Sequence, residues 1–201
     1  VLALVAQATQ AADWPMWRYD ASRSAVTPEQ LPVELKLAWT RTNPPLKPAW
    51  AEDPRLWFDA NYEPIVFGGL IIVAATHNDS VSAYDATSGD ERWRFFADAP
   101  VRLAPIAHEG RIYFGADDGN FYCLEAASGR LVWRSHVALG ERLILGNDRL
   151  ISVWPVRGGA VVADGKLYFT VGVWPFEGTT LYTIDAATGG IVQSDQVGGG
   201  P

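Results

Sequence analysis

The stretch SAYDATSG at residues 82–89, followed by Trp93, returns 40 residues later as YCLEAASG at residues 122–129, followed by Trp133. A third copy, YTIDAATG at residues 182–189, lies 60 residues after the second and has Gln193 where the first two copies have tryptophan. A period of about 40 residues is typical of architectures that repeat one small unit. The sequence therefore predicts a repeat fold whose third unit is stretched.

Each copy ends in a pattern that suits a tight turn. An acidic residue, Asp85, Glu125 or Asp185, comes first, and serine or threonine and then glycine follow it. The carboxylate can accept hydrogen bonds from backbone N–H groups two or three residues further on, and glycine tolerates a positive φ angle. Four residues after the glycine, the indole of Trp93 or Trp133 can bury a large apolar area. We expect these two tryptophans to pack one unit against the next.

Upstream of each turn lies a pair of short apolar runs around a Gly-containing turn, which is the signature of a β-hairpin. These hairpins fall at residues 64–73, 105–114 and 160–169. With one strand before and one strand after each acidic turn, they give four strands in about 40 residues, the size of one β-propeller blade. The sequence predicts an all-β propeller with four-stranded blades at residues 60–99, 100–140 and 150–197, the last with loop insertions. A β-sandwich is the alternative, but it does not require the turn and tryptophan to recur.

The segments Asp85–Trp93 and Glu125–Trp133 resemble the alanine-aspartate-threonine-glycine-tryptophan signature of pyrroloquinoline-quinone (PQQ) propeller repeats. The resemblance covers residues 60–197. It implies a ring of about seven or eight blades, of which this chain holds three and is thus an incomplete part. Residues 35–41, with Trp39, are similar to the outermost strand that closes such a ring against its last blade.

The remaining segments are expected to be irregular. Residues 13–59 form an N-terminal cap that contains the closing strand, and residues 198–201 are interpreted as a truncated end. The cap is rich in proline, and we expect its tryptophans to cover one face of the ring. These are Trp14, Trp17, Trp50 and Trp57.

Composition and charge narrow the range of partners. The chain is 48% hydrophobic with a formal net charge of −7, and its Lys and Arg residues form no cluster, which argues against binding to nucleic acid. No apolar run reaches the roughly 18 residues of a transmembrane segment. Residues 1–12 start with a short apolar run, and Ala6-Gln7-Ala8 has the form of a signal-peptidase site. We expect a signal-peptide remnant here, with a disordered end as the alternative, and hence export to the periplasm or the extracellular space.

The resemblance also implies a cofactor. In quinoprotein dehydrogenases that share this repeat, PQQ lies on the ring axis with calcium, an aspartate base, a tryptophan platform and often a pair of adjacent cysteines. None of these residues can be carried over, because the chain has one cysteine, Cys123, and no motif that marks the base or the calcium ligands. PQQ with calcium is therefore expected from resemblance alone, and we predict no catalytic residue and no metal ligand in this segment.

Other polar groups fit structural roles. Residues 117–120, Asp-Asp-Gly-Asn, carry the oxygen ligands that calcium prefers, but Asp-Gly between aromatic runs is typical of a hairpin turn. Residues 77–79, His-Asn-Asp, fall at the equivalent turn of the preceding blade. His77, His108 and His136 lack the spacing of zinc ligands.

The segment that lengthens the third repeat is the most unusual. It holds two Trp-Pro units twenty residues apart, at Trp154 and Trp174, and each is followed by a charged residue, Arg157 and Glu177. Insertions between strands project from one face of a propeller, where ligands bind. We predict candidate ligand-binding loops in which both tryptophans stack on a ligand and the two charged residues are polar partners. In the alternative, the tryptophans fill space beside long loops and Arg157 pairs with Glu177 as a brace.

These observations favour a non-enzymatic, exported propeller scaffold that presents loops to a protein or a small ligand. The resemblance supports this use, since lipoproteins of the family that assist outer-membrane protein assembly are scaffolds. Two alternatives stay open, because a fold alone does not decide between uses. One is the N-terminal part of a PQQ-dependent dehydrogenase, and the other is a carbohydrate-binding propeller that uses Trp154 and Trp174.

Overall fold

The structure is a computed structural model that describes residues 12–31, 33–54, 57, 59–146, 149–174 and 176–199. Across these ranges the chain forms β-strands joined by loops, and no α-helix is present in them. Residues 1–11 of the expected signal-peptide remnant and residues 200–201 of the expected truncated end lie outside the described residues.

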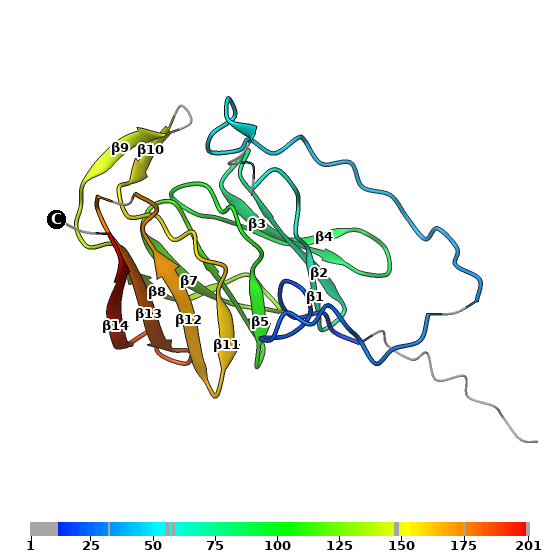
Figure 1. Ribbon diagram of the computed structural model, residues 1–201. Helices are drawn as coiled ribbons and strands as arrows, with labels where there is room; N and C mark the ends of the chain where they lie inside the picture. The colour runs from blue at the N-terminus through cyan, green and yellow to red at the C-terminus, as the bar shows by residue number, and fades with distance from the viewer. Residues whose placement is uncertain are drawn as a thin grey trace, which may run out of the picture.

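Three antiparallel sheets of four strands follow one another along the chain (Figure 1). The first sheet consists of β1 (Ile65–Phe67), β2 (Leu70–Ala75), β3 (Ser80–Asp85) and β4 (Glu91–Phe96). The second consists of β5 (Ile106–His108), β6 (Arg111–Gly115), β7 (Asn120–Glu125) and β8 (Leu131–His136). The third consists of β11 (Val161–Ala163), β12 (Lys166–Val171), β13 (Thr179–Asp185) and β14 (Ile191–Gly198). The predicted all-β propeller of four-stranded blades, incomplete as a ring, is confirmed.

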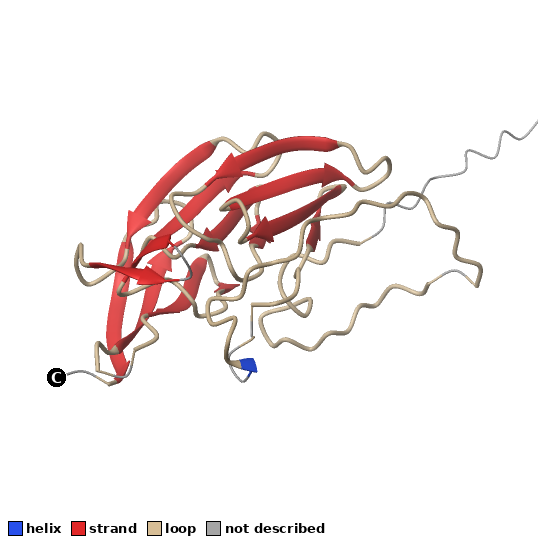
Figure 2. Ribbon diagram, turned by 90° about the horizontal axis from the view of Figure 1, so that it is seen from above, coloured by secondary structure: helices blue, strands red, loops and turns tan. Residues whose placement is uncertain are grey.

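The first strands of the three blades lie next to one another. Strand β5 contacts both β1 and β11, whereas the fourth strands β4, β8 and β14 do not touch one another within the described chain. The sheets therefore diverge outward from their first strands, and the view from above shows them fanned around one side (Figure 2). The first strands mark the axis of the propeller, and the loops that enter them meet there.

The acidic turns form as expected. In the first blade, Oδ1 of Asp85 accepts hydrogen bonds from the backbone N–H groups of Thr87 at 2.8 Å and Ser88 at 2.9 Å. In the third blade, Oδ1 of Asp185 accepts from the N–H of Thr188 at 2.8 Å. In the second blade, the Glu125 carboxylate accepts a hydrogen bond from the hydroxyl of Ser128 at 2.5 Å. All these bonds stay within four residues, so the turn is encoded locally.

The predicted packing role of Trp93 and Trp133 is confirmed. Nε1 of Trp93 donates to the carbonyl of Ala126 in the second blade at 2.8 Å, and Nε1 of Trp133 donates to the carbonyl of Ala186 in the third at 3.3 Å. The glycine of the receiving turn leaves room for the ring: a Cβ on Gly129, at φ +70°, would stand 2.6 Å from Cδ2 of Trp93. Each indole thus fastens one blade to the turn of the next.

Trp39 makes the same kind of contact with the turn of the first blade. Its Nε1 donates to the carbonyl of Ala86 at 3.0 Å, and its ring lies over Gly89 of the first blade. Residues 35–41 nevertheless form no strand, because none of the described strands pairs with them. The expected closing strand therefore does not form, although Trp39 docks on the first blade as such a strand's tryptophan would.

Side chains of the second blade alternate between two apolar cores, as the period of a strand requires. Tyr113 and Phe121 pack toward the third blade, where the ring of Phe121 stacks on Phe169 with 4.1 Å between centroids. Ile112 and Phe114 pack toward the first blade. Each core is therefore an interface between blades, and it holds the loops at the axis in fixed positions.

A further hairpin, not expected from the sequence, is inserted between the second and third blades. It consists of β9 (Leu143–Gly146) and β10 (Arg149–Ser152), paired antiparallel at the upper edge of Figure 1. The N–H of Ser152 donates to the carbonyl of Asp117 at 2.8 Å, which ties the hairpin to the second blade. Ile151 is buried, so one face of the hairpin turns toward the loops that follow it.

Candidate functional site

The structure divides the four predicted loop residues into an outer pair, Trp154 and Glu177, and an inner pair, Arg157 and Trp174. In the outer pair, Nε1 of Trp154 donates to the carbonyl of Glu177 at 3.1 Å. The guanidinium of Arg142 forms an ion pair with the Glu177 carboxylate and lies 5.4 Å from the centre of the Trp154 ring. The alternative in which Arg157 braces Glu177 is therefore wrong, because Arg142 takes that place.

The inner pair meets a tryptophan of the N-terminal cap. Cζ of Arg157 lies 4.8 Å from the centre of the Trp50 ring, and Trp174 packs edge to face on the same ring with 5.6 Å between centroids. Phe176 also stacks on Trp174, with 6.2 Å between ring centroids. The cap thus completes a site whose other walls come from the insertion in the third repeat.

A buried charge network holds this site from below. Asp117 accepts two hydrogen bonds from Arg157, to Oδ1 and Oδ2 at 2.8 Å each, and one from Nε of Arg102 to Oδ2 at 2.6 Å. Nη1 of Arg102 also donates to Oδ2 of Asp59 at 2.7 Å. All four side chains are at most 2% exposed. Two carboxylates balance two guanidinium groups, which is the condition under which buried charges are tolerated.

The network joins three distant segments at one point. Asp59 belongs to the cap, Asp117 to the connection between β6 and β7, and Arg157 to the segment after β10. The N–H of Ala49 donates to Oδ2 of Asp59 at 3.0 Å, which fixes the cap next to Trp50. The loops of the site are therefore held by the network as well as by apolar packing.

Some polar atoms of this region have no hydrogen-bond partner among the described residues although they are buried. They are Oδ1 of Asp59, Nη2 of Arg102, Nη1 of Arg157 and Nε1 of Trp174. Buried polar groups in proteins are nearly always hydrogen-bonded. This cluster is therefore unusual, and two of its four atoms, those of Arg157 and Trp174, belong to the loops that the sequence marks as a ligand site.

A cavity of about 260 Å³ adjoins the inner pair, and we call it the inner cavity. The side chains around it are mostly apolar and come from the cap, the β9–β10 hairpin and the loops of the third repeat. They are Ala49, Trp50, Ile144, Leu145, Gly146, Ile151, Arg157 and Trp174. Next to it, a groove of about 340 Å³ runs past Arg142, Phe176 and Glu177 and shares Trp174 with it.

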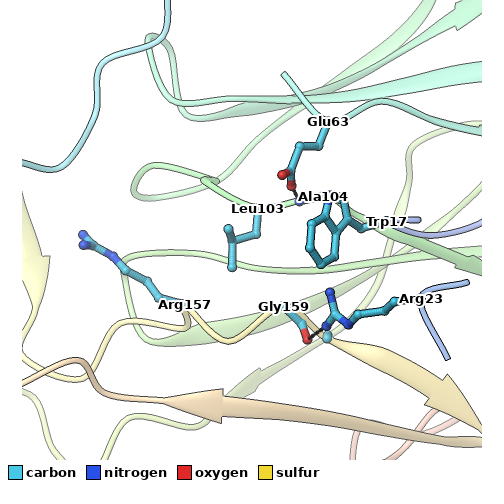
Figure 3. A pocket seen from close by; sticks show the side chains of 8 residues that line it. Trp17, Arg23, Glu63, Leu103, Ala104, Arg157 and Gly159 are labelled. Atoms are coloured by element: carbon cyan, nitrogen blue, oxygen red, sulfur yellow. Dashed lines mark hydrogen bonds between the residues drawn. The ribbon is translucent and has the colours of Figure 1, made fainter. Parts of the chain in front are cut away.

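A third hollow, the axial pocket, lies where loops enter the first strands of the three blades. It measures about 350 Å³. Glu63 stands before β1, Leu103 and Ala104 before β5, and Gly159 before β11, so equivalent positions of successive blades meet there. Figure 3 shows these residues around the pocket.

Two residues of the cap cover the axial pocket. Nη2 of Arg23 donates to the carbonyl of Gly159 at 2.7 Å, and its guanidinium lies 4.6 Å from the centre of the Trp17 ring. On the opposite wall, the Glu63 carboxylate accepts one bond, from the N–H of Ala104 at 3.3 Å. Burial raises the pKa of Glu63 above its ordinary value. The guanidinium of Arg157 points away from this pocket (Figure 3).

The remaining polar groups occupy structural positions. Asp118 closes the turn after β6, where Oδ1 accepts from the N–H of Asn120 at 2.9 Å, but its neighbour Asp117 is a member of the buried network. Cys123 is buried in β7, and burial raises the pKa of its thiol to about 12. Within the described residues, no three His, Cys, Asp or Glu side chains come together as metal ligands, and no helix is long and apolar enough to span a bilayer.

Sequence reasoning missed Asp59, Arg102, Asp117 and Trp50 as members of the site. A weak signal existed for two of them. Arg102 interrupts an apolar run, and Asp117 gives the following turn one more acid than it needs. Neither signal predicts which residue the side chain contacts.

Residues 15–197 match the profile of a family of the PQQ-repeat type, described as outer membrane protein assembly factor BamB. The chain belongs to this PQQ-repeat family. The match includes the cap from Pro15 onward as well as the three blades.

The curated relatives that this chain matches are dehydrogenases much longer than the chain itself. The dehydrogenase subunit of the quinone alcohol dehydrogenase of Gluconobacter oxydans is 28% identical over 133 residues, covering 61% of this chain and 17% of the relative. The 1-butanol dehydrogenase (cytochrome c) of Thauera butanivorans is 26% identical over 136 residues, covering 61% of this chain and 19% of the relative. The chain thus spans about a fifth of the length of these relatives.

Solved structures agree on the PQQ-repeat propeller fold. The quinohemoprotein alcohol dehydrogenase of Comamonas testosteroni superposes with a TM-score of 0.65 at 22% identity, covering 92% of this chain and 27% of that one. A europium-containing methanol dehydrogenase superposes with a TM-score of 0.55 at 19% identity, covering 66% of this chain and 24% of that one.

Proposed function

We propose that this chain is a ligand-binding, non-catalytic part of an exported PQQ-repeat propeller, and that a small ligand lies in the inner cavity. One observation carries the proposal: Trp50, Arg157 and Trp174, from segments far apart in the sequence, enclose one apolar cavity above a buried charge network. Small-molecule sites are concave, mostly apolar and supplied with a few polar groups, and this cavity has that composition.

The chemistry of the cavity favours binding over catalysis. Arg157 is the one titratable residue among the described residues that line it. A guanidinium stays protonated at every physiological pH, whereas general acid–base catalysis needs a group that titrates near the working pH. The two carboxylates nearest to Arg157 and Arg102, those of Asp117 and Asp59, are committed to the network.

A cavity-filling variant tests this proposal. Ala49 lines the inner cavity, and its side chain has no role in the charge network, so A49L places extra volume where the ligand would lie. Ligand-observed NMR with a library of small apolar compounds should find binders to the native protein that A49L no longer binds. If every compound that binds the native protein also binds A49L, the proposal is contradicted.

A second candidate function is that of a quinone-dependent alcohol dehydrogenase, of which this chain would be a part. The relatives named above favour it, and the axial pocket offers a place: Trp17 and Arg23 suit an aromatic anion such as PQQ. The described residues do not fit the calcium ion, since they supply no group of three ligands. If the full-length protein oxidises alcohols in a dye-linked assay after addition of PQQ and Ca²⁺, the dehydrogenase function is correct and the non-catalytic function is wrong.

The carbohydrate-binding alternative has less support. Arg142 lies over the Trp154 ring, and Trp174 contacts both Trp50 and Phe176, so each ring is already engaged by a protein side chain.

Export is proposed from the signal-peptidase pattern at residues 6–8. N-terminal sequencing of the protein from the periplasmic fraction should then begin at Thr9, and an uncleaved cytoplasmic protein would contradict export.

A further inference from the structure

We infer that a polar pocket between the first blade and the N-terminal cap holds a carboxylate group. The pocket measures about 210 Å³, and we call it the cap pocket. Arg41 of the cap and Arg94 of β4 line it, and no aspartate or glutamate of the described chain does. Among the described residues it shares no lining residue with the inner cavity, so it is a separate site.

The floor of the cap pocket is one face of the first blade. Side chains alternate along its strands, so Ile72 and Val81 pack toward the second blade, whereas Val73, Ser82 and Arg94 turn to the opposite face and line the pocket. Ser82 stands opposite both Val73 and Arg94 in the sheet. The cores between the described blades are mostly apolar, but this face carries hydroxyl and guanidinium groups, which need polar partners.

Two guanidinium groups share one carboxylate beside the pocket. Oε2 of Glu91 forms ion pairs with Arg94 and with Nη2 of Arg41, the latter at 3.5 Å. One positive charge is therefore left over, and a group with a single negative charge restores the balance. The Arg41 and Arg94 side chains are 37% and 32% exposed, so a group that enters the pocket can reach both of them.

The charge of the pocket also acts on a histidine in its wall. The pKa of His77 is lowered by burial and, to a smaller extent, by the positive charges of Arg94 and Arg149. Because Arg149 is paired with Asp79, the uncompensated charge comes from the arginines of the pocket. The electrostatic potential at His77 thus has the sign that attracts an anion.

Hydrogen bonds within the floor leave donors for such a group. Oγ of Ser82 accepts a bond from Nε of Arg94 at 3.0 Å, so its own proton is left to donate. Oδ1 of Asn78 accepts from Oγ of Ser80 at 2.8 Å, so the NH₂ end of this amide is left. Both Ser82 and Asn78 line the pocket. A carboxylate only accepts hydrogen bonds, and it binds guanidinium groups more strongly than a neutral acceptor does.

The remaining walls limit what carries the carboxylate. Val73, Ala75 and the ring of Tyr84 offer apolar surface, and Cζ of Arg41 lies 4.2 Å from the centre of that ring. The pocket is smaller than the roughly 300–1,000 Å³ of sites for drug-sized ligands. A short aliphatic acid fits, and so does an aspartate or glutamate side chain from another part of the full-length protein. Both present one carboxylate on a short aliphatic stem.

Propionate, propionamide and propylammonium are probes of similar size that differ in charge. Each is titrated into the full-length protein at pH 7 and constant ionic strength. A ligand that binds the folded state raises the thermal midpoint of unfolding, so the midpoint follows binding. We expect a saturable rise with propionate and none with the other two probes if the carboxylate comes from a free acid.

Three variants test the residues. R94Q removes one guanidinium and should weaken propionate about 10- to 100-fold, the value of a hydrogen bond to a charged group. R134Q is the matched control and should leave the affinity unchanged, because Arg134 follows Trp133 as Arg94 follows Trp93 but does not line the cap pocket. E91Q removes the carboxylate that competes for both arginines, and it should tighten propionate about 2- to 5-fold.

A crystal structure of the full-length protein, soaked with propionate, distinguishes the two sources. Propionate bound to Arg94, with a saturable rise in the midpoint, shows a free acid. An aspartate or glutamate carboxylate on Arg94, with no effect of propionate, shows an internal one. The inference is overturned if the pocket holds neither, or if R94Q and R134Q reduce the effect of propionate equally. None of these outcomes bears on the inner cavity, because the two sites have no lining residue in common among the described residues.

Discussion

Replacement of Asp117 by asparagine should destabilise the protein far more than removal of an exposed carboxylate charge. The Asp117 carboxylate accepts three hydrogen bonds from Arg102 and Arg157, at 2.6 to 2.8 Å, and is about 1% exposed. In D117N, one oxygen is replaced by an NH₂ group that faces a guanidinium N–H, and Asp59 alone remains to balance two buried positive charges. Removal of one partner from a buried ion pair costs about 3–5 kcal/mol.

Two further variants isolate the cause. D98N removes an exposed partner of Arg134, with side chains 49% and 70% exposed for Arg134 and Asp98, and should cost less than about 1 kcal/mol. The double variant D117N/R157M removes one charge of each sign and should recover at least about 1 kcal/mol relative to D117N, because coupled residues are not additive. Together with the single variant R157M, the values for D117N and the double variant give the interaction between Asp117 and Arg157 directly.

The assay is urea unfolding at pH 7 followed by tryptophan fluorescence, with the free energy of unfolding taken from the midpoint and slope. The chain has nine tryptophans, so the fluorescence follows unfolding of the whole protein, including the site at Trp50 and Arg157. A loss below about 1 kcal/mol for D117N, with an unchanged slope, would refute the view that this network holds the loops together.

Three other predictions concern the axial pocket, the blade contacts and the turns. Burial raises the pKa of Glu63 above its ordinary value, so the protonated carboxyl stabilises the folded state below pH 4.5, and this contribution is lost as the pH rises through the folded-state pKa. E63Q removes the buried charge and should therefore raise the urea midpoint at pH 7. Below pH 4.5, E63Q and the native protein should have the same midpoint. Gly129 and Gly110 have φ angles of +70° and +74°, but only at Gly129 would a Cβ strike an indole, so thermal unfolding should show G110A losing about 1–2 kcal/mol and G129A clearly more; equal losses would show that the indole contact adds nothing. The hydrogen bond from Arg92 is the main reason that the pKa of Asp85 is lowered to about 2, so R92Q should raise that pKa in a ¹³C NMR titration, and an unchanged value would argue against the contact.

The blades were predictable because their determinants are local and recur. Asp85 and Asp185 bond to backbone groups within three residues, and Trp93 and Trp133 stand at a fixed distance from their turns. The strand expected at residues 35–41 did not form, since a strand depends on a partner ladder that no local pattern supplies. Its Trp39 still docked, because that contact needs the turn of the first blade and nothing else.

The candidate site was predictable in position but not in its pairing. The two Trp-Pro units marked the loops, and both Arg157 and Trp174 line the inner cavity. Arg157 bonds to Asp117, which lies 40 residues earlier in the sequence. The residue pattern alone does not show that Arg157 pairs with Asp117 and not with the neighbouring turn residue Asp118. Glu177, three residues after Trp174, seemed the natural partner by symmetry, yet the inserted β9–β10 hairpin brings Arg142 to it first.

A crystal structure of the full-length protein tests the central claim most directly. The account predicts electron density of a non-protein molecule in the inner cavity, in contact with Trp50, Arg157 and Trp174. A cavity filled by protein side chains or by ordered water alone would contradict it.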